Sequence, residues 1–158
     1  MAVDFIEELK EAKSHKHSIV LWPRRWRLYD PPLQLQWKIV PFSKESLKKL
    51  PEKPGVYAFL IQPRVADLSA SYPMYIGETE RPLRVRCQEY LQEAAKDLGR
   101  PKVIALLRMY RDFLYFSCAV VEGNISPSVV EDKLLETFLP PANDEFPATV
   151  SRIVKAWS

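Results

Sequence analysis

Apolar positions recur along the chain with two different periods. A spacing of three or four residues, as in an amphipathic helix, predicts helices at 4–12, 82–98, 102–111, 126–139 and 148–157. Alternating or continuous short apolar runs predict strands at 25–29, 33–40, 56–61, 74–78 and 113–121. Residues 43–50 have the pattern of one or two helical turns. Helices and strands therefore both contribute to the expected fold.

Proline and glycine mark the boundaries of these elements. Asp30-Pro31-Pro32 is a turn signal, so residues 25–40 are a predicted β-hairpin. Pro82 and Pro127 suit the first position of a helix, and Ser126 suits the N-cap before the second proline. Residues 62–73 contain two prolines and small polar residues, which favours a loop.

The predicted helix at 126–139 carries an acid inside its apolar face. Its buried arc consists of Val130, Leu134, Leu135 and Phe138, and Glu131 falls within that arc. A carboxylate on an apolar face is costly unless a cation or hydrogen bonds compensate it. Helix geometry alone favours a structural salt bridge to an arginine, so the context must decide the role of Glu131.

The predicted helix at 82–98 places an arginine beside a tyrosine. Arg86 and Tyr90 are four residues apart and are therefore neighbours at one edge of its apolar face. A guanidinium forms forked, charge-assisted bonds to phosphate oxygens, which suits phosphate binding. An ordinary surface arginine whose stem covers apolar side chains is the alternative, and it is favoured without further context.

Two tyrosines and two glycines lie in the central strands. Tyr57 and Tyr75 have the residue type of ordinary strand packing. Gly55 and Gly77 are more informative because the chain has only 4 glycines. Gly77 at a strand end would let a backbone or a ligand come close.

Charge is distributed unevenly in this chain of 158 residues, although its net charge is only +3. Residues 12–29 contain no acid and include Lys13, Lys16, Arg24, Arg25 and Arg27, whereas residues 122–145 are acidic. With the neighbouring tryptophans, the three arginines would bind a phosphate backbone, or they would lie in solvent along a strand. We expect a cationic face and a separate acidic site.

Taken in order, these residues resemble a known family. The succession Gly55-Val56-Tyr57, Tyr75-Ile76-Gly77, Arg86, Tyr90, Glu131 and Asn143 resembles that of the GIY-YIG nuclease domain. That domain occurs in homing endonucleases, in the bacterial nucleotide-excision-repair incision protein and in some type II restriction enzymes. The resemblance implies an α/β (α+β) fold, with a small three-stranded antiparallel sheet flanked by helices. We expect the nuclease-like domain at 51–146, an N-terminal extension with a helix and a β-hairpin at 1–50, and a C-terminal helix at 147–158.

The resemblance also implies roles for individual residues. Glu131 would be the ligand of one Mg²⁺ or Mn²⁺, a hard cation that takes oxygen ligands and keeps several waters. Arg86 would stabilise charge on the scissile phosphate, and Tyr57 would be the general base. Tyr75 and Tyr90 would bond the water or phosphate, and Asn143 would position the site. The residues expected to bind substrate around this centre are Gly77, Arg81, Arg84, Arg24, Arg25 and Arg27.

The chain also departs from the family pattern. Glu78 follows Gly77 where some branches place a lysine, so one cation that would help a tyrosine to ionise is missing. Arg86 comes one residue later than in the repair branch, and the loop at 62–73 is longer than usual. The loop and the first fifty residues would contact nucleic acid or a partner, or would be a surface insertion and a packing extension.

The function expected from these residues is metal-dependent hydrolysis of DNA. A catalytically silent nucleic-acid-binding or protein-interaction module on the same fold, and an RNA nuclease, are the alternatives. One site cuts one strand, so a double-strand break would need a homodimer, a partner protein or two successive events. Cys87 and Cys118 do not have the spacing of metal ligands, and together with the lack of a secretory signal they favour the cytoplasm. The apolar runs are too short for a membrane span, so we expect no membrane association.

Overall fold

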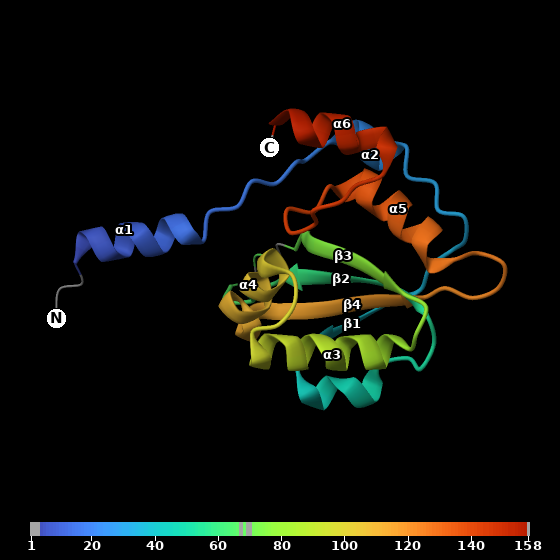
Figure 1. Ribbon diagram of the computed structural model, residues 1–158, viewed down its shortest axis with the longest axis horizontal. Coiled ribbons are helices and arrows are strands. Elements are labelled where there is room, and N and C mark those ends of the chain that lie inside the picture. The colour runs from blue at the N-terminus through green and yellow to red at the C-terminus, as the bar shows by residue number, and fades with distance from the viewer. Residues whose placement is uncertain (1–3, 67, 69–70, 158) are drawn as a thin grey trace.

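An antiparallel sheet forms the centre of the fold in the computed structural model, which describes residues 4–66, 68 and 71–157. Within these residues the sheet has four strands in the order β1-β4-β2-β3: β1 (Trp37–Pro41), β2 (Gly55–Ile61), β3 (Pro73–Thr79) and β4 (Leu114–Val120). Neighbouring strands all run antiparallel. The two central strands are therefore β2 and β4, and β3 has one free edge (Figure 1).

Helices cover the sheet on both sides (Figure 1). One face carries α3 (Leu83–Lys96), α4 (Pro101–Met109) and the 3₁₀ turns η1 (Lys44–Lys49) and η2 (Arg111–Phe113). The other carries α2 (Pro23–Arg27), α5 (Pro127–Phe138) and α6 (Ala148–Trp157). The N-terminal helix α1 (Phe5–Ser14) stands away from this body and is exposed along its length. Within the described part of the chain, none of the helices is both long enough and apolar enough to span a membrane.

The alternation of side chains along β2 produces two separate cores. Tyr57 and Phe59 point to the α3 face and pack with Phe116 of β4. Val56 and Ala58 point to the α5 face and pack with the apolar side of that helix. Because successive strand residues face opposite sides, a sheet of this size buries apolar residues in two layers.

The predicted helices and the central strands are confirmed, with boundaries shifted by a few residues. The apolar arc expected for α5 is correct, since Val130, Leu134 and Leu135 are buried. Pro82 occupies the N-cap position of α3 rather than the first helical position. Asp4 and Ser126 cap α1 and α5, each accepting a backbone N–H two residues ahead.

Two expectations about the sheet are wrong. The sheet has four strands within the described residues, not three. The predicted N-terminal hairpin is not formed by the described residues, because residues 23–27 are helical. Of the second predicted strand, 33–40, only residues 37–40 lie in a strand, β1, and β1 pairs with β4. Pro23 at the start of α2 has the backbone angle a helix needs, and β1 obtains its partner from far along the chain. An alternating pattern indicates a strand but not the strand it pairs with.

Gly55 lets β2 approach β4 closely, and its replacement should weaken the sheet. A Cβ at this position would overlap the backbone carbonyl of Ala119 in the neighbouring strand. We predict that Gly55→Ala lowers the free energy of unfolding by about 1–3 kcal/mol, measured by urea denaturation. Gly123→Asn is the control for backbone strain without a steric clash, because a Cβ there meets nothing within 4 Å and only the φ of 86° penalises a side chain. Equal stability of the two variants would contradict this account of the β2–β4 contact.

Candidate active site

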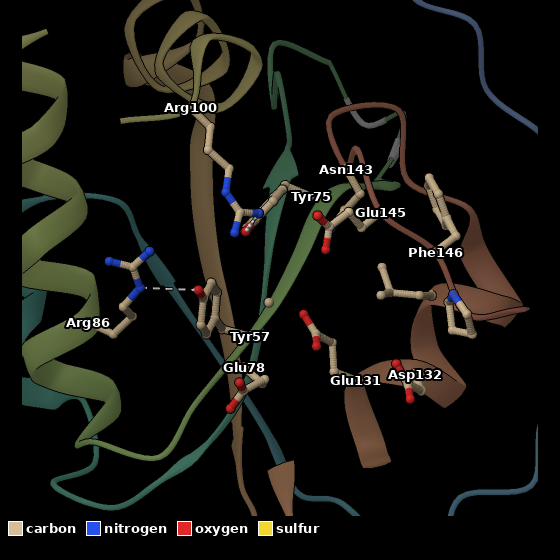
Figure 2. Close-up of a pocket in the computed structure, with 13 residues that line it drawn as sticks. Tyr57, Tyr75, Glu78, Arg86, Arg100, Glu131, Asp132, Asn143, Glu145 and Phe146 are labelled. Atoms are coloured by element: carbon tan, nitrogen blue, oxygen red, sulfur yellow. Dashed lines mark hydrogen bonds between the residues drawn. The ribbon is translucent and has the colours of Figure 1, made fainter. Parts of the chain in front are cut away.

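A pocket of about 340 Å³ lies beside β3, between the α3 and α5 layers. Figure 2 shows Arg86 entering from α3 on one side and Glu131 from α5 on the other, with Tyr57 between them. We call this the tyrosine–glutamate pocket; its lining residues are Tyr57, Tyr75, Gly77, Glu78, Arg86, Arg100, Glu131, Asp132, Leu135, Asn143, Glu145, Phe146 and Pro147. All the residues expected to be catalytic line it, except Tyr90, which lies directly behind Tyr57.

The position of Tyr57 depends on the glycine opposite it. Tyr57 in β2 pairs with Gly77 in β3, and the tyrosine ring lies over that glycine. A Cβ on Gly77 would lie 2.5 Å from both Cζ and the hydroxyl oxygen of Tyr57. Gly77 is thus required so that the hydroxyl of Tyr57 can reach the pocket.

Three tyrosine hydroxyls form a chain at the bottom of the pocket. The hydroxyls of Tyr57 and Tyr90 are 2.8 Å apart, and Tyr90 donates to Tyr75 over 3.5 Å. Arg100, at the N-terminal end of α4, donates to the Tyr75 hydroxyl over 3.4 Å. The three hydroxyls therefore form one connected hydrogen-bond chain that ends at Arg100.

Arg86 is held in one orientation at the mouth of this cluster. Its guanidinium lies over the Tyr90 ring at 4.0 Å, and its Nε donates to the Tyr57 hydroxyl over 3.4 Å. Carboxylates of Glu89 and Glu93 accept from its Nη1 at 2.9 and 3.3 Å. The sequence expectation that Arg86 and Tyr90 are neighbours on α3 is confirmed, and the positive charge is fixed beside the Tyr57 oxygen.

Opposing effects act on the ionisation of Tyr57. Burial raises the pKa of Tyr57 above its ordinary value, and the Tyr75 hydroxyl adds to that rise. The Arg86 charge and hydrogen bonds with Tyr90 and Arg86 lower it. For Tyr90, burial again raises the pKa, and its hydrogen bond with Tyr57 raises it further. The hydrogen bonds therefore favour the ionised form at Tyr57 rather than at Tyr90.

Glu131 lies among other carboxylates. Burial raises the pKa of Glu131 to about 7, and the charges of Glu78, Asp132 and Glu145 raise it further, while Arg100 lowers it. Glu131 takes part in none of the ion pairs found among the described residues. The structural salt bridge that helix geometry favoured is therefore not formed in this part of the chain, and the negative charge of Glu131 has no direct counterion there.

Glu78 carries a further uncompensated atom. Its Oε2 is buried and finds no hydrogen-bond partner among the described residues. Burial raises the pKa of Glu78, and the Glu80 carboxylate adds to this. A buried carboxylate oxygen is costly without a donor or a cation, so Glu78 and Glu131 together fit a divalent cation. Among the residues described, no three His, Cys, Asp or Glu side chains gather closely enough to hold a metal without other ligands. The fit is thus to an ion that keeps several waters.

Asn143 joins the segment after α5 to the free edge of β3. The Ile76 N–H donates to Oδ1 of Asn143 over 2.9 Å, and Nδ2 of Asn143 donates to the Ile76 carbonyl over 2.8 Å. The Ala142 N–H also donates to the Met74 carbonyl. The side chain therefore satisfies both backbone groups of one edge residue, as a neighbouring strand would.

The arginines expected to bind substrate lie outside the pocket. Arg81, just before α3, pairs with Glu89 of that helix, and Arg84 on α3 pairs with Glu52; both arginines are exposed. Arg25 donates to the carbonyl and the carboxylate of Glu136 on α5 and has a side-chain exposure of 18%. Arg24 and Arg27 are exposed on α2. Of the substrate-binding set, the structure places only Gly77 in the tyrosine–glutamate pocket.

Sequence reasoning missed four charged residues of the pocket. Arg100 stands between two predicted helices and has the sequence context of a linker, and Asp132 gives no signal because it lies outside the apolar arc of the helix at 126–139. Glu145 follows the last motif residue, and Glu78 was noticed only as a departure from the family pattern. The signal available was the run of acids from 122 to 145, which indicated an acidic site but not its members.

Comparison with curated proteins finds a relative that matches part of this chain. The chain is 32% identical over 100 residues to UvrABC system protein C from Syntrophomonas wolfei subsp. wolfei. The matched stretch is 63% of this chain but only 14% of that relative's length. No family model and no solved structure matches the chain. The similarity therefore supports a relationship to one part of a much longer protein.

Ionisation of Glu131 should make the metal-free protein less stable at higher pH. The pKa of Glu131 is about 7 in the folded protein against an ordinary value of 4.5, so the unfolded chain loses this proton first. The free energy of unfolding should therefore fall as pH rises from about 4.5 to about 7 and then level off. Glu131→Gln should lack this fall and exceed wild type at pH 8 by about 1–2 kcal/mol, a value reduced for partial exposure.

Urea denaturation in EDTA at several pH values measures this difference. Glu122→Gln is the matched control, because Glu122 is an exposed glutamate paired with Lys53. Its pH dependence should follow that of wild type. Wild-type stability that rises between pH 5 and 8, with Glu131→Gln following the same curve, would contradict the assigned pKa shift.

Proposed function

We propose that this chain is a metal-dependent endonuclease of the GIY-YIG type that hydrolyses DNA phosphodiester bonds. The observation that carries the proposal is that Glu131 and the pair formed by Tyr57 and Arg86 come from opposite layers of the fold and line one pocket. The similarity to UvrABC system protein C supports the same assignment and favours an incision role in DNA repair.

In the proposed reaction Tyr57 accepts the proton of the attacking water. Its oxygen is beside the Arg86 guanidinium, which would favour the ionised form and stabilise charge on the phosphate. When the oxygen of Tyr57 is ionised, Tyr90 would donate its single hydroxyl proton to it, and the Tyr90–Tyr75 bond would then reverse, with Tyr75 donating to Tyr90 and Arg100 donating to Tyr75. In this proposal Tyr57 thus accepts the proton, and Arg86 holds a positive charge beside the phosphate.

Glu131 would hold one Mg²⁺ or Mn²⁺, with Glu78 as a second carboxylate nearby. When bound, the cation would act as a Lewis acid that stabilises the leaving oxygen of an in-line displacement. Asn143 would keep the segment after α5 on the sheet edge, so that the carboxylates of this segment stay opposite Tyr57.

Two alternatives differ from this proposal in one property each. An RNA nuclease would use the same side chains on a strand with 2′-hydroxyls. A binding module would keep the fold without hydrolysis, and the buried carboxylate with its raised pKa would then destabilise the fold without contributing to catalysis.

We further propose residues 51–146 as the catalytic unit, residues 147–158 as an added helix, and a cytoplasmic location. A homodimer or partner protein would permit double-strand cleavage.

Cleavage of DNA should require Glu131 and Arg86. We predict that wild type nicks supercoiled plasmid in Mg²⁺ or Mn²⁺, and that Glu131→Gln and Arg86→Ala each lose at least about a hundredfold in rate. Glu122→Gln and Arg108→Ala are matched surface controls, since Glu122 pairs with Lys53 and Arg108 with Asp97, both outside the pocket. Both controls should cut at the wild-type rate. Gel quantification of nicked and linear product measures the rates.

Thermal unfolding with and without the metal tests whether Glu131 binds the ion even if the cleavage assay shows no activity. Mg²⁺ or Mn²⁺ should raise the melting temperature of wild type but not of Glu131→Gln, because a ligand stabilises only the fold that binds it. Cleavage of matched RNA in place of DNA would replace the proposal by the RNA nuclease. A folded Glu131→Gln protein that cuts at the wild-type rate would remove Glu131 from the site.

A further inference from the structure

A second hollow adjoins the tyrosine–glutamate pocket. It has a volume of about 620 Å³ and lies between the N-terminal arm, the start of α4 and the end of α6. Asn143 and Phe146 line both hollows, so the two are adjacent. We call it the Lys16 groove; the lining residues used below are Lys16, His17, Lys102, Asp144, Phe146 and Trp157.

The Lys16 groove is lined by two lysines and one acid. Lys16 and Lys102 line it, and Lys102 pairs with Asp144 at 2.8 Å. Arg100, two residues before Lys102, lines the neighbouring pocket together with Arg86. The acids that line the tyrosine–glutamate pocket and not the groove are Glu78, Glu131, Asp132 and Glu145. The groove therefore places two lysines next to an acidic pocket, where they would complement the phosphates of a strand.

The arm that supplies Lys16 is fixed rather than free. The residues on either side of Lys16, His15 and His17, bond the Tyr110 hydroxyl through Nδ1 and Nε2 at 2.9 and 2.8 Å. Farther along the arm, the Tyr72 hydroxyl donates to the Val20 carbonyl over 3.0 Å. Anchors on both sides of Lys16 hold this part of the arm against the body, so a ligand would meet a preformed surface.

Aromatic side chains at the rim suit an unpaired base. Trp157 is 52% exposed, and Phe146 is half-buried between the two hollows. Every base has a face that stacks on an aromatic ring, and such stacking needs a base that is not paired within a duplex. A concave hollow of this volume admits single nucleotides, whereas a duplex would meet only its rim.

We infer that the Lys16 groove binds an unpaired nucleotide of the strand next to the scissile phosphate, with Trp157 as the stacking surface and Lys16 and Lys102 on the backbone. This inference rests on the proposed nuclease function and gives its substrate class: nucleic acid with a single-stranded segment beside the cut. It places strand binding at the arm and α4, in contrast to the sequence expectation for Arg24, Arg25 and Arg27.

The arginines of α2 supply a matched control. Arg24 and Arg27 are as basic and as exposed as the groove lysines, but they line neither hollow. Arg25 is already bonded to Glu136. Loss of Lys16 and Lys102 should thus weaken strand binding where loss of Arg24 and Arg27 does not.

Fluorescence anisotropy with labelled oligonucleotides in EDTA tests the groove without cleavage. Single strands, splayed duplexes and fully paired duplexes of the same sequence are titrated at several salt concentrations. Lys16→Ala with Lys102→Ala should weaken single-strand binding at least about tenfold and reduce the slope of log K against log salt by about 1.4, two phosphate contacts on a single strand. Arg24→Ala with Arg27→Ala should leave both values at wild type.

Three further variants test the contributions of charge and of stacking. Asp144→Asn should tighten binding, because it frees Lys102 from its acidic partner. Trp157→Ala should weaken single-strand binding at least about fivefold, and Trp157→Phe should restore most of it. Fully paired duplex should respond to neither tryptophan change. Circular dichroism on each variant establishes that the fold is intact.

The outcomes for the groove and for the nuclease are separable. Wild-type cleavage together with unchanged binding by the Lys16/Lys102 variant, or binding lost only in the Arg24/Arg27 variant, would overturn the groove and leave the nuclease standing. The absence of cleavage by wild type, with single-strand binding that depends on Lys16, Lys102 and Trp157, would overturn the nuclease and leave the groove standing. Equal affinity for paired and unpaired strands would overturn the unpaired base.

Discussion

The two hydrogen bonds between Asn143 and Ile76 are the constraint on which the rest of the site depends. They close the free edge of β3 with a side chain, and they hold the segment after α5 along that edge. Because of this attachment, Glu145 lies in the same pocket as Tyr57 and Arg86, beside Glu131, which the packing of α5 on the sheet brings there. The sheet itself separates the side chains on its two faces, so residues from both faces can meet only at an edge, here the edge of β3.

The edge position also explains why the site carries so many uncompensated charges. A residue at the rim of a sheet is partly withdrawn from water without being enclosed by a core. Glu131 and Glu78 are therefore desolvated enough for their pKa values to rise, yet still accessible through a pocket. Arg86, by contrast, has two carboxylate partners on its own helix. Acids with raised pKa values, beside an arginine that already has carboxylate partners, are more typical of a binding site than of a stabilising ion-pair network.

The sequence predicted elements and neighbours that lie close together along the chain. It missed strand pairing and contacts between residues far apart in the sequence. The apolar arc of α5 and the proximity of Arg86 to Tyr90 follow from helical spacing, and both are correct. The segment around Trp26 alternates like a strand, but Pro23 begins a helix there and the tryptophan remains 39% exposed. Arg100 gave no signal, because its contact with Tyr75 joins the start of α4 to β3. Spacing identifies faces of elements, whereas a site between layers requires their packing.

Glu78 stands where some branches of the family that the chain resembles place a lysine, so that positive charge is not available to help Tyr57 ionise. Burial opposes a phenolate, and an acid in this position adds no positive charge to offset it. The remaining help comes from Arg86 and from the Tyr90 hydroxyl, both on α3. Glu78 instead adds a second carboxylate near Glu131, which would increase the attraction for a divalent cation. Arg86 and Tyr90 are therefore the groups that lower the pKa of Tyr57, whereas Glu78 adds its charge to the side of the pocket that holds Glu131.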